Sequence, residues 1–158
     1  MRPANFHPAT ILATWFWIGL IRKAPGTWGS VAALPLAWLM QHFWGDLALL
    51  GGCVLISVVG VWAAGHHATR KELHDPGEIV IDEVAGQWIA CLALPTDELW
   101  PYLLALVLFR VFDIAKPWPI SVLDRHGRGG LGIMQDDILA GLFVFSLMQL
   151  LLVALEVL

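Results

Sequence analysis

The sequence predicts an all-α fold: a small polytopic membrane helical bundle with about four to five membrane-embedded helices and an N-terminal interfacial helix. The chain has 158 residues, of which 58% are hydrophobic and 14% charged, and its mean hydropathy is +0.72. A soluble domain carries about 25% charged residues. No linker, charge block or low-complexity tract divides the chain, so we expect a single integral-membrane domain spanning residues 1–158.

The first apolar segment covers residues 9–21 and predicts the interfacial helix. It contains Trp15, Phe16 and Trp17 in succession. Aromatic rings of this kind are typical of the head-group boundary, where the ring is buried and its edge stays near water. The segment has no small-x-small cleavage site, so we expect it to be retained and not removed as a signal peptide.

Five further apolar runs show no strand-like alternation and predict the embedded helices. They cover residues 29–44, 47–65, 79–94, 99–112 and 138–158. The second and fifth runs approach or reach the roughly 20 residues that cross a hydrocarbon core. The third and fourth runs are limited by Pro95 and Pro101. We therefore consider them candidates for a re-entrant hairpin, in which some segments are short and do not span.

The basic residues predict the orientation of the bundle. All nine fall on one side of this layout: Arg2, Arg22, Lys23, Arg70, Lys71, Arg110, Lys116, Arg125 and Arg128. The opposite connections, residues 45–46 and 95–98, contain neither Lys nor Arg. Under the positive-inside rule the basic side faces the cytoplasm.

Five carboxylates lie at or near the ends of the apolar runs: Asp82, Glu83, Asp113, Asp136 and Asp137. Carboxylates there are costly unless they are paired or bind a metal. Helix capping explains one carboxylate per helix, but not two adjacent ones in two helices. Three helix ends that return to one face would make an oxygen-rich cage of the kind that Mg²⁺ prefers.

Small residues follow both acidic pairs. Gly86 and Gly141 each lie four residues after an aspartate, Asp82 and Asp137 respectively. Small residues let helices approach closely. We expect these glycines to bring the two acidic pairs together, although close helix packing without a catalytic meaning gives the same pattern.

Basic side chains near these carboxylates in sequence predict a phosphate site, because metal and basic groups together neutralise a phosphate monoester. Two hydroxyls in the turn before the first embedded helix could also donate to phosphate. The candidates are Arg110, Lys116, Thr27, Ser30 and Arg128. All of these except Arg110 have an alternative explanation. Lys116 could form a helix ion pair with Asp113, and Thr27 or Ser30 could cap a helix. Arg128 lies in the glycine-rich segment 127–132, which a mobile loop also explains.

The cysteines and histidines give weaker signals. Cys53 and Cys91 lie inside apolar runs and are expected to be small buried hydrophobic residues. We interpret His66, His67 and His74 as solvated histidines of a cytoplasmic loop and not as a zinc site. His74 and Asp75 remain candidates for supporting the acidic site.

Four motifs in order carry a resemblance to a known family. They are APGTWGSVAALP, IVIDEVAGQWIA, FRVFDIAKPWPI and GGLGIMQDDILAGL. In this order and spacing, over roughly residues 11–145, the chain resembles the phosphatidylglycerophosphatase A family of bacteria. The resemblance implies Mg²⁺-dependent hydrolysis of the terminal phosphate of phosphatidylglycerophosphate to give phosphatidylglycerol and phosphate. It also implies a multi-pass protein of the bacterial inner membrane, with its active site facing the cytoplasm.

The resemblance also marks site residues by position. The family motif residues present here are Thr27, Ser30, Asp82, Glu83, Gly86, Arg110, Asp113, Lys116, Pro117, Asp136, Asp137 and Gly141. Our hypothesis assigns Mg²⁺ to Asp82, Glu83, Asp136 and Asp137, with Asp113 as a further ligand or the base toward water. The expected partner is a phospholipid in the bilayer, with no nucleic acid.

The hypothesis favours direct attack of water over an aspartyl-phosphate intermediate, because the Asp-x-Asp-Gly run of haloacid-dehalogenase-type phosphatases is missing. The motifs of CDP-alcohol phosphotransferases and of histidine-dependent lipid phosphatases are missing too. An alternative from another class is a small membrane cation transporter or channel subunit. A permeation path needs ionisable groups across the bilayer, whereas the far half of the last run has only Gln149 and Glu156.

Overall fold

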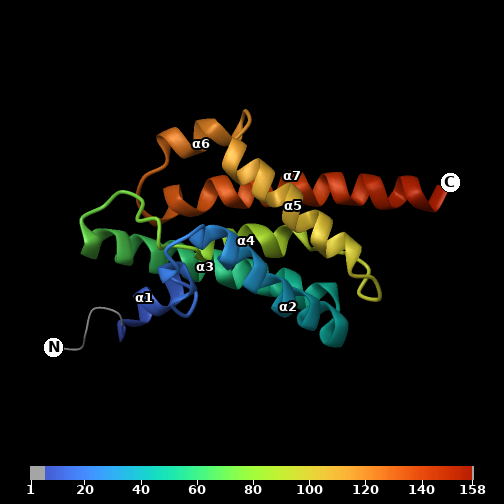
Figure 1. Ribbon diagram of the computed structural model, residues 1–158, viewed down its shortest axis with the longest axis horizontal. Coiled ribbons are helices and arrows are strands. Elements are labelled where there is room, and N and C mark those ends of the chain that lie inside the picture. The colour runs from blue at the N-terminus through green and yellow to red at the C-terminus, as the bar shows by residue number, and fades with distance from the viewer. Residues whose placement is uncertain (1–5, 158) are drawn as a thin grey trace.

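The computed structural model describes residues 6–157, and within them it is all-helical with no strand (Figure 1). Arg2 lies outside the described residues. The elements are α1 (Pro8–Ala13), the 3₁₀ helix η2 (Ile18–Leu20), α2 (Pro25–Trp44), α3 (Asp46–Lys71), α4 (Ile81–Ala90), α5 (Trp100–Ala115), α6 (Ile120–His126) and α7 (Gly129–Val157). The predicted fold class is therefore confirmed as all-α.

The N-terminal segment is a short helix followed by a tight left-handed turn, not one continuous helix. Trp15, Phe16 and Trp17 all have positive φ, between 44° and 69°. This turn sends Trp15 inward, where it is 7% exposed and packs edge-on against Trp88. Phe16 and Trp17 stay exposed. The expectation of a head-group position is therefore wrong for Trp15, because its ring belongs to the core.

The second apolar run extends further than predicted. Helix α3 continues to Lys71, so that His66 and His67 lie in its last turns. His67 is buried at 3% exposure, whereas His66 is exposed and stacks on His7. The placement of His66 and His67 in a solvated loop is wrong, because the α3 backbone continues to form helix through them.

Helices α4 and α5 form a hairpin whose two open ends meet at the acidic site. Helix α4 has only 10 residues, or about 15 Å, which is half the thickness of a hydrocarbon core. Residues 91–99 then connect it to α5, which runs back and ends at Ala115. Lys116 follows in a left-handed conformation, and Pro117 prevents the helix from continuing. Helix α6, which the sequence did not predict, leads into α7.

Helix α7 begins at Gly129, nine residues before the predicted apolar run. Asp136 and Asp137 consequently lie within the helix, two turns from its start. They cannot cap it, so the capping explanation is wrong for this pair. Residues 129–132 of the glycine-rich segment are helical too and not a loop. A Cβ at Gly130 would overlap the carbonyl of Val61, so α7 begins in close contact with α3.

Helix α4 forms the centre of the bundle, between α2 and α3 on one side and α5 and α7 on the other (Figure 1). Nine of its ten residues are buried, so its polar side chains are enclosed by protein. A Cβ at Gly141 would overlap the carbonyl of Gly86, and one at Gly86 would lie 2.5 Å from the Asp137 carbonyl. The backbones of α4 and α7 therefore touch, as the small residues predict. Cys53 and Cys91 are buried and free.

The described part of the chain contains two helices long and apolar enough to cross a membrane, α3 and α7. Large apolar side chains also cover the outside of the bundle, including Leu47 at 82%, Val58 at 67% and Leu150 at 69% exposure. Helices that face lipid have such a surface, since the tails around them are as apolar as the core.

The α4–α7 contact gives a first test. We expect Gly141→Ala to lower the stability by about 1–3 kcal/mol, because the new methyl group must push the two backbones apart. Gly51→Ala is the matched control, since a Cβ there has no atom within 4 Å. Thermal unfolding in detergent measures both. Equal melting temperatures for the two variants would contradict the close crossing.

Candidate active site

The acidic motifs meet in a polar cavity of about 180 Å³ at one end of the bundle. Its walls come from the start of α2, the α3–α4 connection, α4, the ends of α5 and α6, and α7. Its charged lining residues are Asp75, Asp82, Glu83, Asp113, Lys116, Asp124, Asp136 and Asp137. All five carboxylates expected at a common site therefore line one cavity, although they come from three helices.

Three of these carboxylates form the innermost group. Asp82 and Glu83 lie in the first turn of α4, and Asp137 reaches them from α7. One oxygen of each lies within 4.8 Å of the others. Asp82 is 8% exposed and Asp137 is 3% exposed. The Gly86–Gly141 contact lies one turn further along the same two helices and explains why these side chains can converge.

The donor set fits a hard divalent cation. Asp82 Oδ1 and Glu83 Oε2 are buried and have no hydrogen-bond partner within the described structure. A buried carboxylate oxygen without a donor is costly, and three carboxylates at this separation repel each other. Mg²⁺ prefers carboxylate oxygens and would satisfy both needs. Asp82, Glu83 and Asp137 are therefore the residues suited to hold it.

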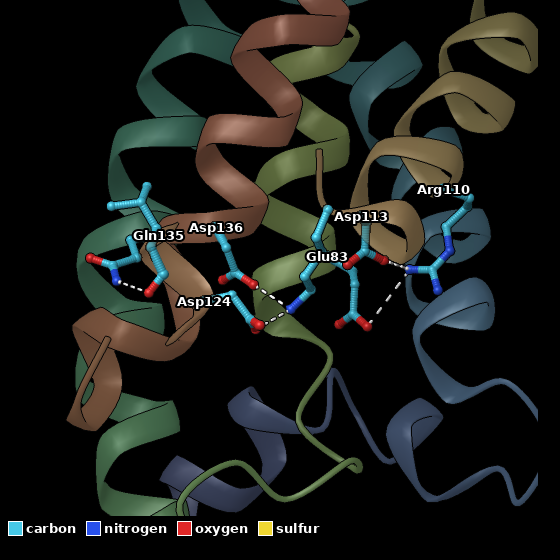
Figure 2. Close-up of polar contacts among 8 residues, drawn as sticks. Glu83, Arg110, Asp113, Asp124, Gln135 and Asp136 are labelled. Atoms are coloured by element: carbon cyan, nitrogen blue, oxygen red, sulfur yellow. Dashed lines mark hydrogen bonds and ion pairs between the residues drawn. The ribbon is translucent and has the colours of Figure 1, made fainter. Parts of the chain in front are cut away.

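Arg110 balances part of this charge from α5 (Figure 2). Its Nη1 lies 2.5 Å from Asp113 Oδ2 and 3.7 Å from Glu83 Oε1. Gly26 completes this corner, since a Cβ there would overlap the Glu83 carboxylate. Arg110 is therefore held between Asp113 and Glu83. It lies behind the carboxylates and does not line the cavity.

Lys116 is held by two other aspartates, Asp124 and Asp136, which are labelled in Figure 2. Its Nζ donates to Asp136 Oδ2 at 2.7 Å and also pairs with Asp124. Burial opposes the charged form of Lys116, but these two hydrogen bonds outweigh it and raise its pKa. The helix pair between Lys116 and Asp113 does not form, because the left-handed turn at Lys116 directs its amine toward α6 and α7.

Two cavity residues were absent from the predicted site. Asp124 lies on α6, a helix too short to give a clear apolar period. Asp75, considered only as a supporting group, lines the cavity itself together with His74. Burial and the nearby Asp136 carboxylate raise the pKa of Asp75. Their position depends on chain folding far from the motifs, and no local pattern indicates it.

The α3–α4 connection is fastened by a buried histidine. His67 Nε2 lies 2.6 Å from Glu78 Oε1, and its Nδ1 lies 3.0 Å from Thr10 Oγ1. Lys71 Nζ pairs with the same Glu78 oxygen at 3.0 Å. This clasp of four residues ties α1, α3 and the connection together. It therefore fixes the wall of the cavity that carries His74 and Asp75.

Besides Arg110, three predicted phosphate ligands do not line the cavity. Ser30 is buried, and its hydroxyl donates to the Gly26 carbonyl at 3.0 Å. Thr27 is half-buried in the first turn of α2, and Arg128 is exposed between α6 and α7. Neither hydroxyl is the N-cap of α2, since Ala24 takes that position without a side-chain cap. A phosphate role for these three residues stays a prediction.

Comparison with known proteins identifies the family. The model of the family Phosphatidylglycerophosphatase A matches residues 11–152. The chain belongs to this family. The sequence resemblance is thereby confirmed, and the protein is an enzyme of a lipid phosphatase family of phospholipid metabolism.

Three curated relatives cover most of the chain. Phosphatidylglycerophosphatase A of Escherichia coli (strain K12) is 42% identical over 140 residues, 85% of this chain and 78% of that protein. The protein of the same name from Haemophilus influenzae is 38% identical, over 87% of this chain and 84% of its own. A Bacteroides thetaiotaomicron protein named putative phosphatidylinositol-3-phosphatase is 35% identical, over 93% of this chain and 94% of its own. No solved structure matches the chain.

The clasp predicts a pH dependence of stability. Burial opposes ionisation of Glu78, but hydrogen bonds from Lys71 and His67 outweigh it and lower its pKa below the ordinary 4.5. The carboxylate therefore stabilises the fold fully above that ordinary value, and this contribution is lost as the pH falls through the lowered value. We expect the melting temperature in detergent to fall more steeply with acidification in the parent protein than in Glu78→Gln.

Glu72→Gln is the control, because Glu72 is exposed at the end of α3. Its acid profile should follow that of the parent protein. A Glu78→Gln profile parallel to the parent would show that the clasp does not contribute through its charge.

Proposed function

We propose that this enzyme removes the terminal phosphate of phosphatidylglycerophosphate in a Mg²⁺-dependent hydrolysis that yields phosphatidylglycerol and phosphate. The observation that carries the proposal is the group of carboxylates Asp82, Glu83 and Asp137 in a cavity that Lys116 also lines. One oxygen of Asp82 and one of Glu83 are buried there without a hydrogen-bond partner. Family membership and the names of two relatives support the choice of lipid.

In this proposal Asp82, Glu83 and Asp137 hold the Mg²⁺ ion. When bound, the ion would withdraw charge from phosphate oxygens and lower the pKa of water. Asp136 was also a predicted metal ligand. In the structure it accepts a hydrogen bond from Lys116. We assign Asp136 and Asp124 to holding the Lys116 amine, and Lys116 to a phosphate oxygen.

The other residues orient the reactants. Arg110 fixes the Asp113 carboxylate, which lines the cavity and accepts a proton from the attacking water. The water oxygen bonds to phosphorus as the bond between phosphorus and the glycerol oxygen breaks. The released glycerol oxygen takes a proton from solvent water, Asp113 returns its proton to the hydroxide left there, and the products are phosphate and the lipid alcohol. Positioning and charge neutralisation are the main demands of such a reaction.

We further propose a multi-pass arrangement in the bacterial inner membrane, with α2, α3, the α4–α5 hairpin and α7 embedded. Two observations support an active site facing the cytoplasm. Lys71 at the end of α3 pairs with Glu78 beside the cavity, and Lys116 lines the cavity itself. The connection at residues 45–46, at the other end of α2, carries no basic residue.

No contact in the described structure favours the transporter alternative. A permeation path needs carboxylates spread through the bilayer, whereas Asp82, Glu83, Asp113, Asp136 and Asp137 line one cavity at a single end of the bundle.

Phosphate release by the purified protein in detergent tests the proposal. We expect release from phosphatidylglycerophosphate with Mg²⁺ and none with a chelator. Asp82→Asn and Asp137→Asn should each lower kcat/KM by about 100-fold or more, since each removes a ligand charge. Glu156→Gln, exposed near the far end of α7, is the matched control and should keep full activity.

A phosphatidylinositol 3-phosphate substrate belongs in the same assay, because one relative bears that name. Preferential turnover of that lipid would overturn the substrate assignment. Release that persists at full rate in chelator would overturn the metal assignment.

The role of Lys116 has a separate test. We expect Lys116→Gln to lower kcat/KM about 10- to 100-fold while the Mg²⁺ concentration for half-maximal activity stays unchanged, because the amine contacts phosphate and not the ion. A shift in the Mg²⁺ requirement alone would instead assign Lys116 to organising the metal site.

A further inference from the structure

A second cavity, larger and apolar, lies beside α2. Its volume is about 580 Å³. Val31, Leu34, Pro35 and Trp38 of α2 form one wall. This spacing places them in a single stripe along the helix. Tyr102 of α5 and residues 96–99 of the α4–α5 connection form the rest, and the exposed Asp97 and Glu98 are the acidic residues of this lining. We refer to this cavity as the α2–α5 groove.

The polar atoms of Trp38 and Tyr102 are not available to a ligand, because each already forms a hydrogen bond within the protein. Trp38 Nε1 donates to the Thr96 carbonyl at 2.8 Å, and the Tyr102 hydroxyl donates to Gln41 Oε1 at 2.8 Å. Both rings therefore offer apolar surface to the groove. Such a groove suits a hydrocarbon chain better than a polar ligand.

The groove and the polar cavity of the active site, which we call the phosphate cavity, lie on the same two helices. Gly26 of α2 and Asp113 of α5 line the phosphate cavity, whereas Val31 to Trp38 and Tyr102 line the groove. At 1.5 Å per residue, the groove begins about 8 Å along α2 from Gly26 and reaches about 18 Å. Along α5, Tyr102 lies about 17 Å from Asp113.

These distances match the dimensions of the proposed substrate. The terminal phosphorus and the first acyl carbon are separated by a glycerol, a phosphodiester and a second glycerol. At roughly 1.2 Å per bond, this link spans up to about 13 Å when extended and less when bent. An acyl chain would thus enter the groove when the terminal phosphate lies at the carboxylates.

We propose that the α2–α5 groove holds one acyl chain of the lipid substrate, and so orients the head group toward the carboxylates. This inference rests on the proposed function. The wall on α2 ends at Trp38, about 10 Å beyond Val31, so the groove accommodates roughly the first eight carbons of the chain. Lipid tails are as apolar as the groove. Its contribution is therefore alignment of the substrate more than affinity.

Filling the groove tests this inference. The measurement compares kcat/KM for phosphatidylglycerophosphate with kcat/KM for the same head group without acyl chains. We expect Val31→Trp to lower kcat/KM for the diacyl lipid relative to kcat/KM for the head group alone by about fivefold or more. The reason is that the indole occupies space needed by the acyl chain. Leu36→Trp is the matched control: Leu36 is exposed on α2 but does not line the groove, and the ratio should stay unchanged.

A substrate that carries a photoreactive group in the first eight carbons of one acyl chain gives a readout independent of turnover. We expect crosslinks to the peptides that contain Leu34, Trp38 and Tyr102, reduced in Val31→Trp. Equal ratios for the two Trp variants, or crosslinks spread evenly over the exposed apolar residues, would overturn the inference. Absence of phosphate release from the diacyl lipid by the parent protein would instead overturn the proposed function.

Discussion

The direct contact between the α4 and α7 backbones is the constraint on which the site depends. A side chain at Gly86 or Gly141 would hold the two helices apart, and Asp82, Glu83 and Asp137 could no longer offer oxygens within 4.8 Å of one another. The contact is buried in the centre of the bundle, where α4 is enclosed by four other helices. The same packing brings the three carboxylates together, where their charges repel one another. The free energy gained by burying the apolar side chains around α4 therefore compensates for this repulsion.

The site separates its charges into two layers. Asp82, Glu83 and Asp137 form an inner acidic group, and the cationic side chains are each held by other carboxylates: Arg110 by Asp113, and Lys116 by Asp124 and Asp136. Among the described residues, Arg110 makes the one ion pair with the inner group, its Nη1 lying 3.7 Å from Glu83 Oε1, whereas Lys116 pairs with the outer aspartates. A divalent ion and a phosphate monoester carry opposite charges, and such a layered site suits both at once. The clasp at His67 and Glu78 holds the remaining wall in place.

The phosphate cavity and the apolar groove together suit a molecule that is polar at one end and apolar along the rest. Helices α2 and α5 line both spaces, so a rotation of either helix would change the alignment of head group and tail together. The outside of the bundle is also apolar. What distinguishes the groove from that surface is its concave shape and its fixed distance from the carboxylates, not its hydrophobicity.

The sequence by itself determined the helical class, the five carboxylates as a group, the role of Gly86 and Gly141 and the family, because these depend on composition, on spacing along a helix or on the order of motifs along the chain. Only the tertiary structure decided that Asp136 pairs with Lys116, that Asp113 pairs with Arg110, and that Asp75 and Asp124 join the cavity. It also placed Trp15 and His67 in the interior. The physical reason is that an ionised or aromatic side chain takes its partner from whichever segment folds against it. In a bundle of mostly apolar helices the local sequence does not indicate which segment that is.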